Sequence, residues 1–263
     1  MQSPRAHGIV RTRWRLEDVS QALRWLQGYS VSGVWQILKR LGFSRKQALH
    51  FLRSPDPNYR FKWQRILLAY QEAVAQPEAV VLLFQDECTY YRRAKVRHCY
   101  QTRGKCQRRH HHRAGTDNKA RITAALDALT GRVLYLQRSK VGCQQLIRFY
   151  QQIRIAYPNA QRIYLVQDNW PIHKHSDVLQ AAQTQQLSLL FLPSYASWLN
   201  PIEKLWRWLR QDILHNHEGS DNFKQLRYQV MDWLDQFAHG SFPLLHYVGI
   251  LSRDELSIPV LNC

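Results

Sequence analysis

The sequence has few acidic residues for its number of basic ones, and it lacks the long apolar runs that cross membranes. Its 263 residues contain 19 Asp and Glu against 37 Lys and Arg, a formal net charge of +18. No run of about 18 apolar residues occurs, which excludes a transmembrane helix. The first residues contain no apolar stretch of signal-peptide length, so we expect a cytoplasmic protein that contacts no membrane.

Two catalytic motifs and a disulfide framework are also missing. No glycine-rich GxxxxGKS/T phosphate loop occurs, which argues against an ATPase. No GxSxG elbow occurs, which argues against a serine hydrolase. The five cysteines are an odd number without regular spacing, so we expect reduced thiols. Cys99 and Cys106, followed by three histidines at 110–112, lack the closely spaced cysteine pair of a zinc site.

The excess of positive charge indicates a polyanionic partner. The isoelectric point is near 10.0 in a chain that is 45% hydrophobic and therefore able to form a core, which favours nucleic-acid binding. Eleven Lys and Arg lie between Arg92 and Arg121, against the single acid Asp117. A solvated face is the alternative. However, the positive charges of so basic a segment repel one another, and binding to phosphates, which neutralises them, explains the segment better.

The chain divides into a small helical part and a larger α/β part. Apolar residues recur at helical spacing from Leu16 to Leu26 and from Val31 to Leu41, with a glycine between the two runs. Two short helices joined by such a turn among basic residues are typical of a helix-turn-helix, although any helical hairpin in a basic protein has the same pattern. We therefore expect a DNA-binding domain over residues 1–60, ending in the proline-containing linker Ser54–Arg60, and a second domain over residues 61–263.

The second part alternates strands and helices. The apolar run Ala79–Phe84 is typical of a strand buried on both faces. Further strands are expected at 96–101, 106–111, 122–128, 133–137, 162–167 and 187–193, and helices at 63–75, 144–156, 176–186, 201–215 and 222–238. A strand meander followed by alternating helices and strands predicts a mixed α/β sheet covered by helices.

Two aspartates lie where core strands are expected to end. Asp86 directly follows the apolar run AVVLLFQ, and Asp168 directly follows RIYLVQ. Open α/β sheets place their ligands at the carboxyl ends of their strands, and an unpaired carboxylate at the edge of a core needs a partner. The alternative for Asp168 is that it caps the turn that follows it, whereas Asp86 has no evident helix start to cap. The two together favour a functional pair.

Two roles fit Glu203 at the start of a predicted helix. Asn200 is positioned as the N-cap and Pro201 as the first helical residue, so Glu203 falls where a capping box has its acid. The helix dipole keeps such a carboxylate ionised, which also makes it a good ligand for a hard divalent cation. Arg207 and Arg210 share its helical face. Capping and metal binding both remain open, and we favour metal binding.

Two aspartates and a glutamate at one end of a sheet have a chemical logic in a protein that binds phosphates. Phosphodiester cleavage needs a deprotonated water or hydroxyl and a stabilised leaving oxygen, and two Mg²⁺ ions about 3.5–4 Å apart supply both. Carboxylate oxygens select Mg²⁺ or Mn²⁺ over zinc. We therefore predict that Asp86, Asp168 and Glu203 hold two such ions.

Three segments of the chain resemble the DDE transposases, most closely the bacterial insertion-sequence branch of the mariner superfamily. These are FQDE (84–87), QDNWPIHKH (167–175) and LPSYASWLNPIEKLWRWLR (192–210), and 34 residues separate Asp168 from Glu203, as in that branch. The resemblance implies an RNase H-like catalytic domain with a mixed five-stranded sheet flanked by helices. It also implies a transposase that cuts at the ends of its element and transfers the strands into target DNA, at TA dinucleotides. The alternative is a catalytically idle or domesticated descendant that only binds DNA.

The same resemblance suggests supporting residues and partners. Asn169 would support the metal ligands from outside, and His173 would contact a phosphate or the shell around the metal, the alternative being a structural histidine. A homodimer would act on terminal inverted repeats and target DNA in the bacterial nucleoid. Members of the branch usually carry two helix-turn-helix units, of which only the second is evident here, over Leu16–Lys46. The basic residues expected to contact DNA are Arg24, Lys39, Arg40, Arg45, Lys46, Arg92, Arg93, Arg103, Lys105, Arg108, Arg109, Arg113, Arg207 and Arg210.

Overall fold

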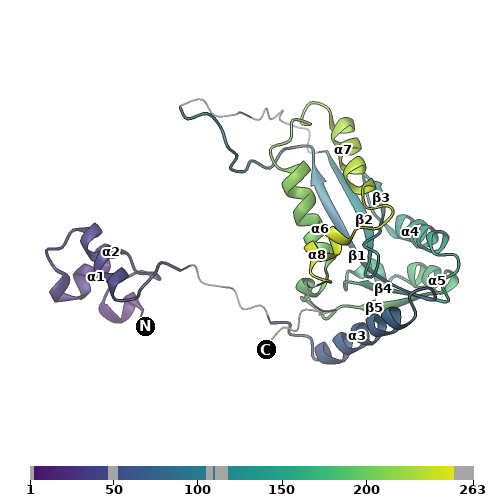
Figure 1. The fold of residues 1–263 in the computed structure, drawn as a ribbon, viewed down its shortest axis with the longest axis horizontal. Helices are drawn as coiled ribbons and strands as arrows, with labels where there is room; N and C mark the ends of the chain where they lie inside the picture. The colour runs from purple at the N-terminus through teal and green to yellow at the C-terminus, as the bar shows by residue number, and fades with distance from the viewer. Residues whose placement is uncertain (1–2, 47–52, 105–108, 110–117, 252–263) are drawn as a thin grey trace. The chain divides into compact units, whose positions relative to one another are not determined.

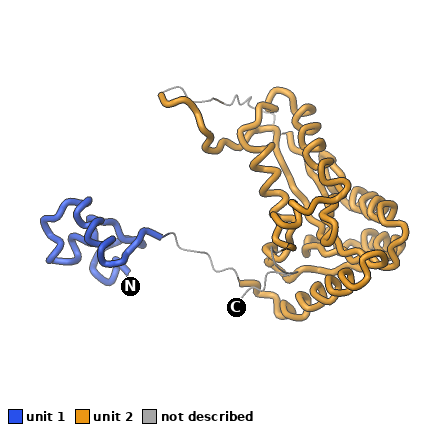
Figure 2. The backbone as a smooth tube through the Cα atoms, viewed as in Figure 1, with its two compact units in different colours: residues 1–52 blue, residues 53–263 orange. Residues whose placement is uncertain are grey.

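The protein folds into two compact units, Met1–Leu52 and Arg53–Cys263, which Figure 2 colours separately. The computed structural model describes residues 3–46, 53–104, 109 and 118–251. Within these residues no helix is long and apolar enough to cross a membrane.

The boundary between the units lies earlier in the chain than the predicted one, which falls inside helix α3 (Tyr59–Ala75). The residues just before α3, expected to form a linker, already bind the second unit. Ser54 Oγ donates a hydrogen bond to the Ser194 carbonyl (2.6 Å), and the Ser194 amide donates to Asp56 Oδ2 (2.8 Å). This stretch therefore belongs to the second unit, because its polar side chains form hydrogen bonds with Ser194 of that unit.

Short helices make up the first unit. They are η1 (Pro4–His7), α1 (Leu16–Ala22), η2 (Arg24–Leu26) and α2 (Val31–Arg40). The helix predicted from Leu16 to Leu26 is interrupted at Leu23, whose extended backbone (φ −107°, ψ 103°) separates α1 from η2. Ser30 Oγ accepts a hydrogen bond from the Gly33 amide (3.1 Å) and caps α2. Two packed helices are present, and their role as a helix-turn-helix stays a prediction.

The second unit is built on one mixed sheet (Figure 1). Its strands are β1 (Val80–Tyr91), β2 (Lys119–Asp127), β3 (Val133–Arg138), β4 (Arg162–Gln167) and β5 (Leu187–Phe191). They lie in the order β3-β2-β1-β4-β5, in which β1 pairs antiparallel with β2 and parallel with β4. The predicted mixed five-stranded sheet is confirmed, and the strand that contains most of the apolar run Ala79–Phe84 lies at its centre.

Helices cover both faces of this sheet (Figure 1). Besides α3 they are α4 (Cys143–Ala156), η3 (Pro171–Lys174), α5 (Ser176–Thr184), η4 (Ser197–Leu199), α6 (Ile202–Leu209), the π-helix η5 (Arg210–Leu214), α7 (Phe223–Asp235) and α8 (Phe242–Val248). One core, beneath α3, α6, α7 and α8, contains Leu82 and Phe84 of β1. The other, beneath α4 and α5, contains Val81 and Leu83. Neighbouring residues of β1 therefore face different helices.

Some elements differ from those predicted. Strand β1 continues to Tyr91, because its second half pairs with β2 alone. Residues 96–101 are not a strand, since the Asn216 side chain, and not a neighbouring strand, binds the backbone of Arg97 through two hydrogen bonds (2.8 and 3.0 Å). The strand predicted at 106–111 lies outside the described residues except for one position. Helix α8 was not expected.

Gly131, in the turn between β2 and β3, adopts a backbone conformation that costs other residues energy. Its φ is +71°, and an added Cβ would collide with the carbonyl oxygen of Ser241. We expect Gly131→Ala to lower the free energy of unfolding by about 3 kcal/mol, because a left-handed backbone and overpacking each cost on the order of 1–3 kcal/mol. Urea unfolding measures this. Gly104→Ala separates the two causes, because its φ of +150° also strains a side chain whereas no atom lies within 4 Å of a Cβ there. It should cost less than Gly131→Ala; equal midpoints for Gly131→Ala and wild type would contradict the prediction.

Candidate active site

The register of the two central parallel strands places Asp86 and Asp168 at the same level. Phe84 of β1 lies opposite Val166 of β4, and this is the last parallel pair. Each aspartate lies two residues beyond that pair, so the register places both on the sheet face that α6 covers. Strand β4 ends before Asp168, whereas β1 continues past Asp86. Asp86 therefore lies within a strand, and the prediction that it follows one is corrected.

Helix α6 brings Glu203 to the same place. Its fully buried Trp206 donates Nε1–H to Asp86 Oδ2 (2.9 Å). Burial, together with the negative charges of Glu203 and Glu87, raises the pKa of Asp86 to about 8. Burial also raises the pKa of Glu203, and the charge of Asp168 adds to this rise. Glu203 is thus close enough to Asp86 to affect its ionisation, and Asp168 is close enough to affect that of Glu203.

The start of α6 does not contain the capping box that was the alternative role of Glu203. In the described residues around this helix start, no side-chain hydrogen bond caps the helix. Asn200, the predicted N-cap, donates its side-chain amide to the Gln85 carbonyl instead (3.0 Å) and ties the helix start to β1. The position of Glu203 is therefore set by the packing of α6, and its carboxylate takes no part in capping.

Asp168 does cap the turn that follows it. Its Oδ1 accepts a hydrogen bond from the Trp170 amide (2.8 Å). The side chain is nevertheless 50% exposed, so a phosphate or a metal ion can reach it from solvent. The neighbouring Asn169 donates its side-chain amide to the Leu192 carbonyl (2.6 Å), which joins the ends of β4 and β5. Both contacts hold the loop that carries Asp168 in one position.

The carboxylates of Asp86, Asp168 and Glu203 are the kind of ligand that suits a hard divalent cation, although they are not already arranged around an ion position. Among the residues that the structure describes, no group of three or more His, Cys, Asp or Glu is arranged to hold an ion. The three side chains offer carboxylate oxygens alone, which Mg²⁺ and Mn²⁺ prefer. Burial and mutual repulsion raise the pKa of Asp86 and of Glu203, and a cation between them would relieve that repulsion.

A buried histidine connects Asp168 with an acid that the motifs did not single out. His173 is 1% exposed, and its Nε2 lies 3.4 Å from Asp168 Oδ1 and 3.5 Å from Glu87 Oε2. Glu87 follows Asp86 in the sequence and so points to the opposite face of β1. The pair of adjacent acids in FQDE was the only sign of it in the sequence.

The basic residues predicted to contact DNA lie largely on the surface. Those that are exposed are Arg24, Lys39, Arg40, Arg45, Lys46, Arg93, Arg103, Arg109 and Arg207. Arg92 is partly buried and donates to the carbonyls of Ser220 and Asp221. Arg210 donates to the sulfur of Cys88 (3.7 Å), a buried thiol whose pKa burial raises to about 11. Three of the predicted residues lie outside the described ones: Lys105, Arg108 and Arg113.

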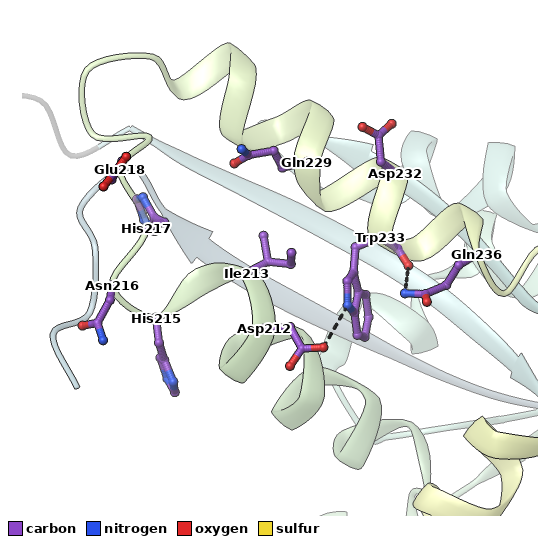
Figure 3. Close-up of a pocket in the computed structure, with 10 residues that line it drawn as sticks. All are labelled: Asp212, Ile213, His215, Asn216, His217, Glu218, Gln229, Asp232, Trp233 and Gln236. Atoms are coloured by element: carbon purple, nitrogen blue, oxygen red, sulfur yellow. Dashed lines mark hydrogen bonds between the residues drawn. The ribbon is translucent and has the colours of Figure 1, made fainter. Parts of the chain in front are cut away.

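A groove between η5 and α7 contains acids and histidines but none of the three carboxylates (Figure 3). Trp233 Nε1 donates to Asp212 Oδ2 on its wall (3.2 Å). Asp232, His215 and Glu218 also line it. In the part of the chain that the structure describes, these side chains are not arranged as a metal site. The groove therefore offers no competing candidate for an ion.

The mixed sheet and the carboxylates just beyond the last parallel pair of its central strands agree with the DDE class expected from the motifs. Residues 81–227, more than half of the chain, match the family described as DDE superfamily endonuclease. The chain belongs to this family. The predicted membership of the DDE class is thereby confirmed.

One curated relative and several solved structures are similar to the chain. The relative is the insertion element IS630 uncharacterized 39 kDa protein of Shigella sonnei, which is 25% identical over 228 residues. The match covers 86% of this chain and 65% of the relative, so the chain spans just under two thirds of the relative's length.

The solved structures are complexes of the Mos1 transposase. The paired-end complex with the left transposon end has a TM-score of 0.60 and 15% identity, over 93% of this chain and 77% of that one. The mariner Mos1 paired-end complex with Mg has a TM-score of 0.62 and 17% identity, over 92% and 77%. These likenesses confirm the predicted RNase H-like fold of the second unit.

Proposed function

We propose that the protein is a DNA transposase of the cut-and-paste type, which cleaves DNA at the ends of an insertion element and joins the freed strands to target DNA at TA dinucleotides. The observation that carries the proposal is the convergence of the three carboxylates. Asp86 and Asp168 lie level, each two residues beyond the last parallel pair of β1 and β4, and the charge of Glu203 acts on Asp86 while the charge of Asp168 acts on Glu203. The names of the IS630 relative and of the Mos1 transposon-end complexes support it, since both refer to mobile DNA.

Two divalent ions, Mg²⁺ or Mn²⁺, are the cofactors of this proposal, and Asp86, Asp168 and Glu203 would hold them. Bound there, such ions activate water and stabilise the leaving oxygen of a phosphodiester. The chain's own task is to orient the ligands, and the indole of Trp206 does this for Asp86 while the amide of Trp170 does it for Asp168. The Mos1 complexes with Mg and with Mn support the choice of metal.

The surplus of basic residues provides the proposed DNA interface. In the first unit, exposed Lys39 and Arg40 lie in the last turn of α2, where they would contact the terminal inverted repeats. In the second unit, exposed Arg93 and Arg103 lie in the segment after β1. A homodimer is proposed because an element has two ends that must be cut and joined together. Such a protein would act at the nucleoid.

Joining of DNA ends to a target is the direct test of this function. Linear DNA that carries the sequences flanking the gene is incubated with the protein, a target plasmid and either Mg²⁺ or Mn²⁺. We expect cleavage at inverted repeats and insertion at TA dinucleotides, read by sequencing the products. Binding of the repeats without cleavage or insertion in either metal would favour the alternative function, a catalytically idle DNA-binding protein.

Binding of DNA should weaken steeply with salt, because each phosphate contact contributes roughly −0.9 to the slope of log affinity against log salt concentration. Arg108→Ala and Arg109→Ala should each weaken binding equally on all DNA sequences and make that slope shallower by about 1. Fluorescence anisotropy at several salt concentrations measures both effects. Arg162→Ala is the control, since Arg162 pairs with Glu72 at the opposite end of β4. A flat salt dependence, or a loss confined to one sequence, would contradict phosphate binding by this segment.

A further inference from the structure

Glu87 is a second acid beside Asp86 that faces the other side of the sheet. Residues of β1 alternate between the two cores, so Asp86 faces α6 and Glu87 faces α4 and α5. The Glu87 side chain is only 12% exposed. A nearly buried carboxylate on the face away from Glu203 needs hydrogen-bond partners on that face to offset its burial. These partners indicate the role of Glu87.

Two buried side chains fix one oxygen of Glu87. Gln85 Nε2 donates to Oε1 (2.7 Å), and Thr123 Oγ1 donates to the same oxygen (3.2 Å). Gln85 also donates to Thr123 (3.1 Å), and both residues are fully buried in the sheet. The Glu87 carboxylate is therefore held in one orientation by Gln85 of its own strand and Thr123 of β2, with its second oxygen turned toward His173.

His173 links this second oxygen to Asp168. Its Nε2 lies 3.5 Å from Glu87 Oε2 and 3.4 Å from Asp168 Oδ1. Carboxylate oxygens accept hydrogen bonds, and a hydrogen on Nε2 would lie between the two acids. The ring of Trp170 packs edge-on against His173, with centroids 5.6 Å apart and planes at 79°. The histidine is thus held between a fixed acid and an exposed one.

We propose that Glu87 is a positioning residue, which acts through His173 to hold the carboxylate of Asp168 where a divalent cation binds. The inference rests on the proposed function, since it assigns Asp168 to a metal ion. A ligand carboxylate that is half exposed swings between rotamers unless something holds it, and outer partners of this kind commonly change metal affinity by about 10–100-fold. Glu87 takes this role because it is rigid, nearly buried and on the far side of the strand from Glu203.

Binding of Mn²⁺ to the full chain, measured by electron paramagnetic resonance, tests the inference without relying on catalysis. Glu87→Gln keeps the size of the side chain but presents an N–H group where His173 needs an acceptor. We expect it to weaken Mn²⁺ binding by about tenfold, with little change in the melting temperature measured without metal. The control is Glu72→Gln, which alters a carboxylate paired with Arg162 far along β4 and should leave Mn²⁺ affinity unchanged.

Variants of His173 separate positioning from a merely structural role. In His173→Gln the side-chain amide carries an N–H donor in place of Nε2, so we expect it to retain most of the Mn²⁺ affinity, whereas His173→Leu should lose about as much as Glu87→Gln. The double variant Glu87→Gln/His173→Leu should lose no more than His173→Leu alone, because both changes act on Asp168 along one path.

Four results would overturn the inference. Wild-type Mn²⁺ affinity in Glu87→Gln would show that Glu87 does not act on the site. Losses that add up in the double variant would show that Glu87 contacts the ion directly. If Glu87→Gln fails to fold, equal Mn²⁺ affinities of His173→Gln and His173→Leu would contradict the inference. Absence of Mn²⁺ binding in the wild-type chain would overturn the proposed function as well, which distinguishes that failure from the others.

Discussion

The Asp168→Asn variant is expected to lose Mg²⁺-dependent nicking of supercoiled plasmid by about 10³-fold or more. An amide in place of the carboxylate removes the charge that binds a metal ion, and metal ions supply several kcal/mol of transition-state stabilisation, at 1.36 kcal/mol per tenfold in rate. The fold should survive, because the side-chain oxygen of the amide can still accept the hydrogen bond from the Trp170 amide. Gel electrophoresis of nicked and supercoiled forms measures the rate.

A matched change on the surface controls for this variant. Asp177 in α5 is 65% exposed and pairs only loosely with His175 (3.8 Å), so Asp177→Asn removes the same charge without touching the site. We expect it to nick like the wild type. Equal nicking by Asp168→Asn and wild type would show that the assigned carboxylate is wrong, and binding of plasmid without nicking by any of the proteins would favour the idle DNA-binding alternative.

The sheet and the positions of Asp86 and Asp168 could be predicted because they follow from short stretches of the sequence. A continuous apolar run such as Ala79–Phe84 has few alternatives to a central strand, and the position of Asp168 follows directly from the end of the next central strand. Parallel pairing of those strands then brings the acids level, as Phe84 opposite Val166 shows. The pattern of hydrophobic residues and the rules of strand pairing are thus enough to predict the sheet and the level of the two aspartates.

The parts that sequence reasoning missed depend on contacts between distant segments. The extension of β1 depends on its pairing with β2, which brings Tyr91 opposite Lys119. Asn200 had the sequence position of a helix cap, but β1 offered its side chain the carbonyl of Gln85 instead. Glu87 was overlooked because nothing in FQDE shows that His173, many residues later, packs against it. Local sequence patterns do not reveal contacts between residues that are far apart in the chain.

The missed contacts concern the site more than the fold. Trp206 is fully buried, yet its indole also donates to Asp86. Asn169 joins two strand ends, and His173 bridges two acids. Each of these side chains lies in or beside the core and also makes a polar contact at the site, which a hydrophobic pattern alone could not reveal.

The Glu203→Gln variant is expected to lose nicking activity by about 10³-fold while the protein keeps or gains stability. Loss of the charge removes a metal ligand. The fold should not suffer, because Gln has the same size and, in the described residues around the start of α6, no side-chain hydrogen bond caps the helix. The change also removes a charge that helps to raise the pKa of Asp86. Plasmid nicking and thermal unfolding of the same preparations measure the two effects.

The dependence of this stability change on pH identifies its cause. Burial raises the pKa of Glu203 in the folded protein, so the ionised group destabilises the fold at high pH and the wild type regains that stability as the pH falls toward the pKa of the unfolded chain. Gln carries no such charge. The melting temperature of Glu203→Gln should therefore exceed that of wild type more at pH 8 than at pH 5. Unfolding of the variant at both pH values would instead assign Glu203 to the helix start, and the metal site would lose its third carboxylate.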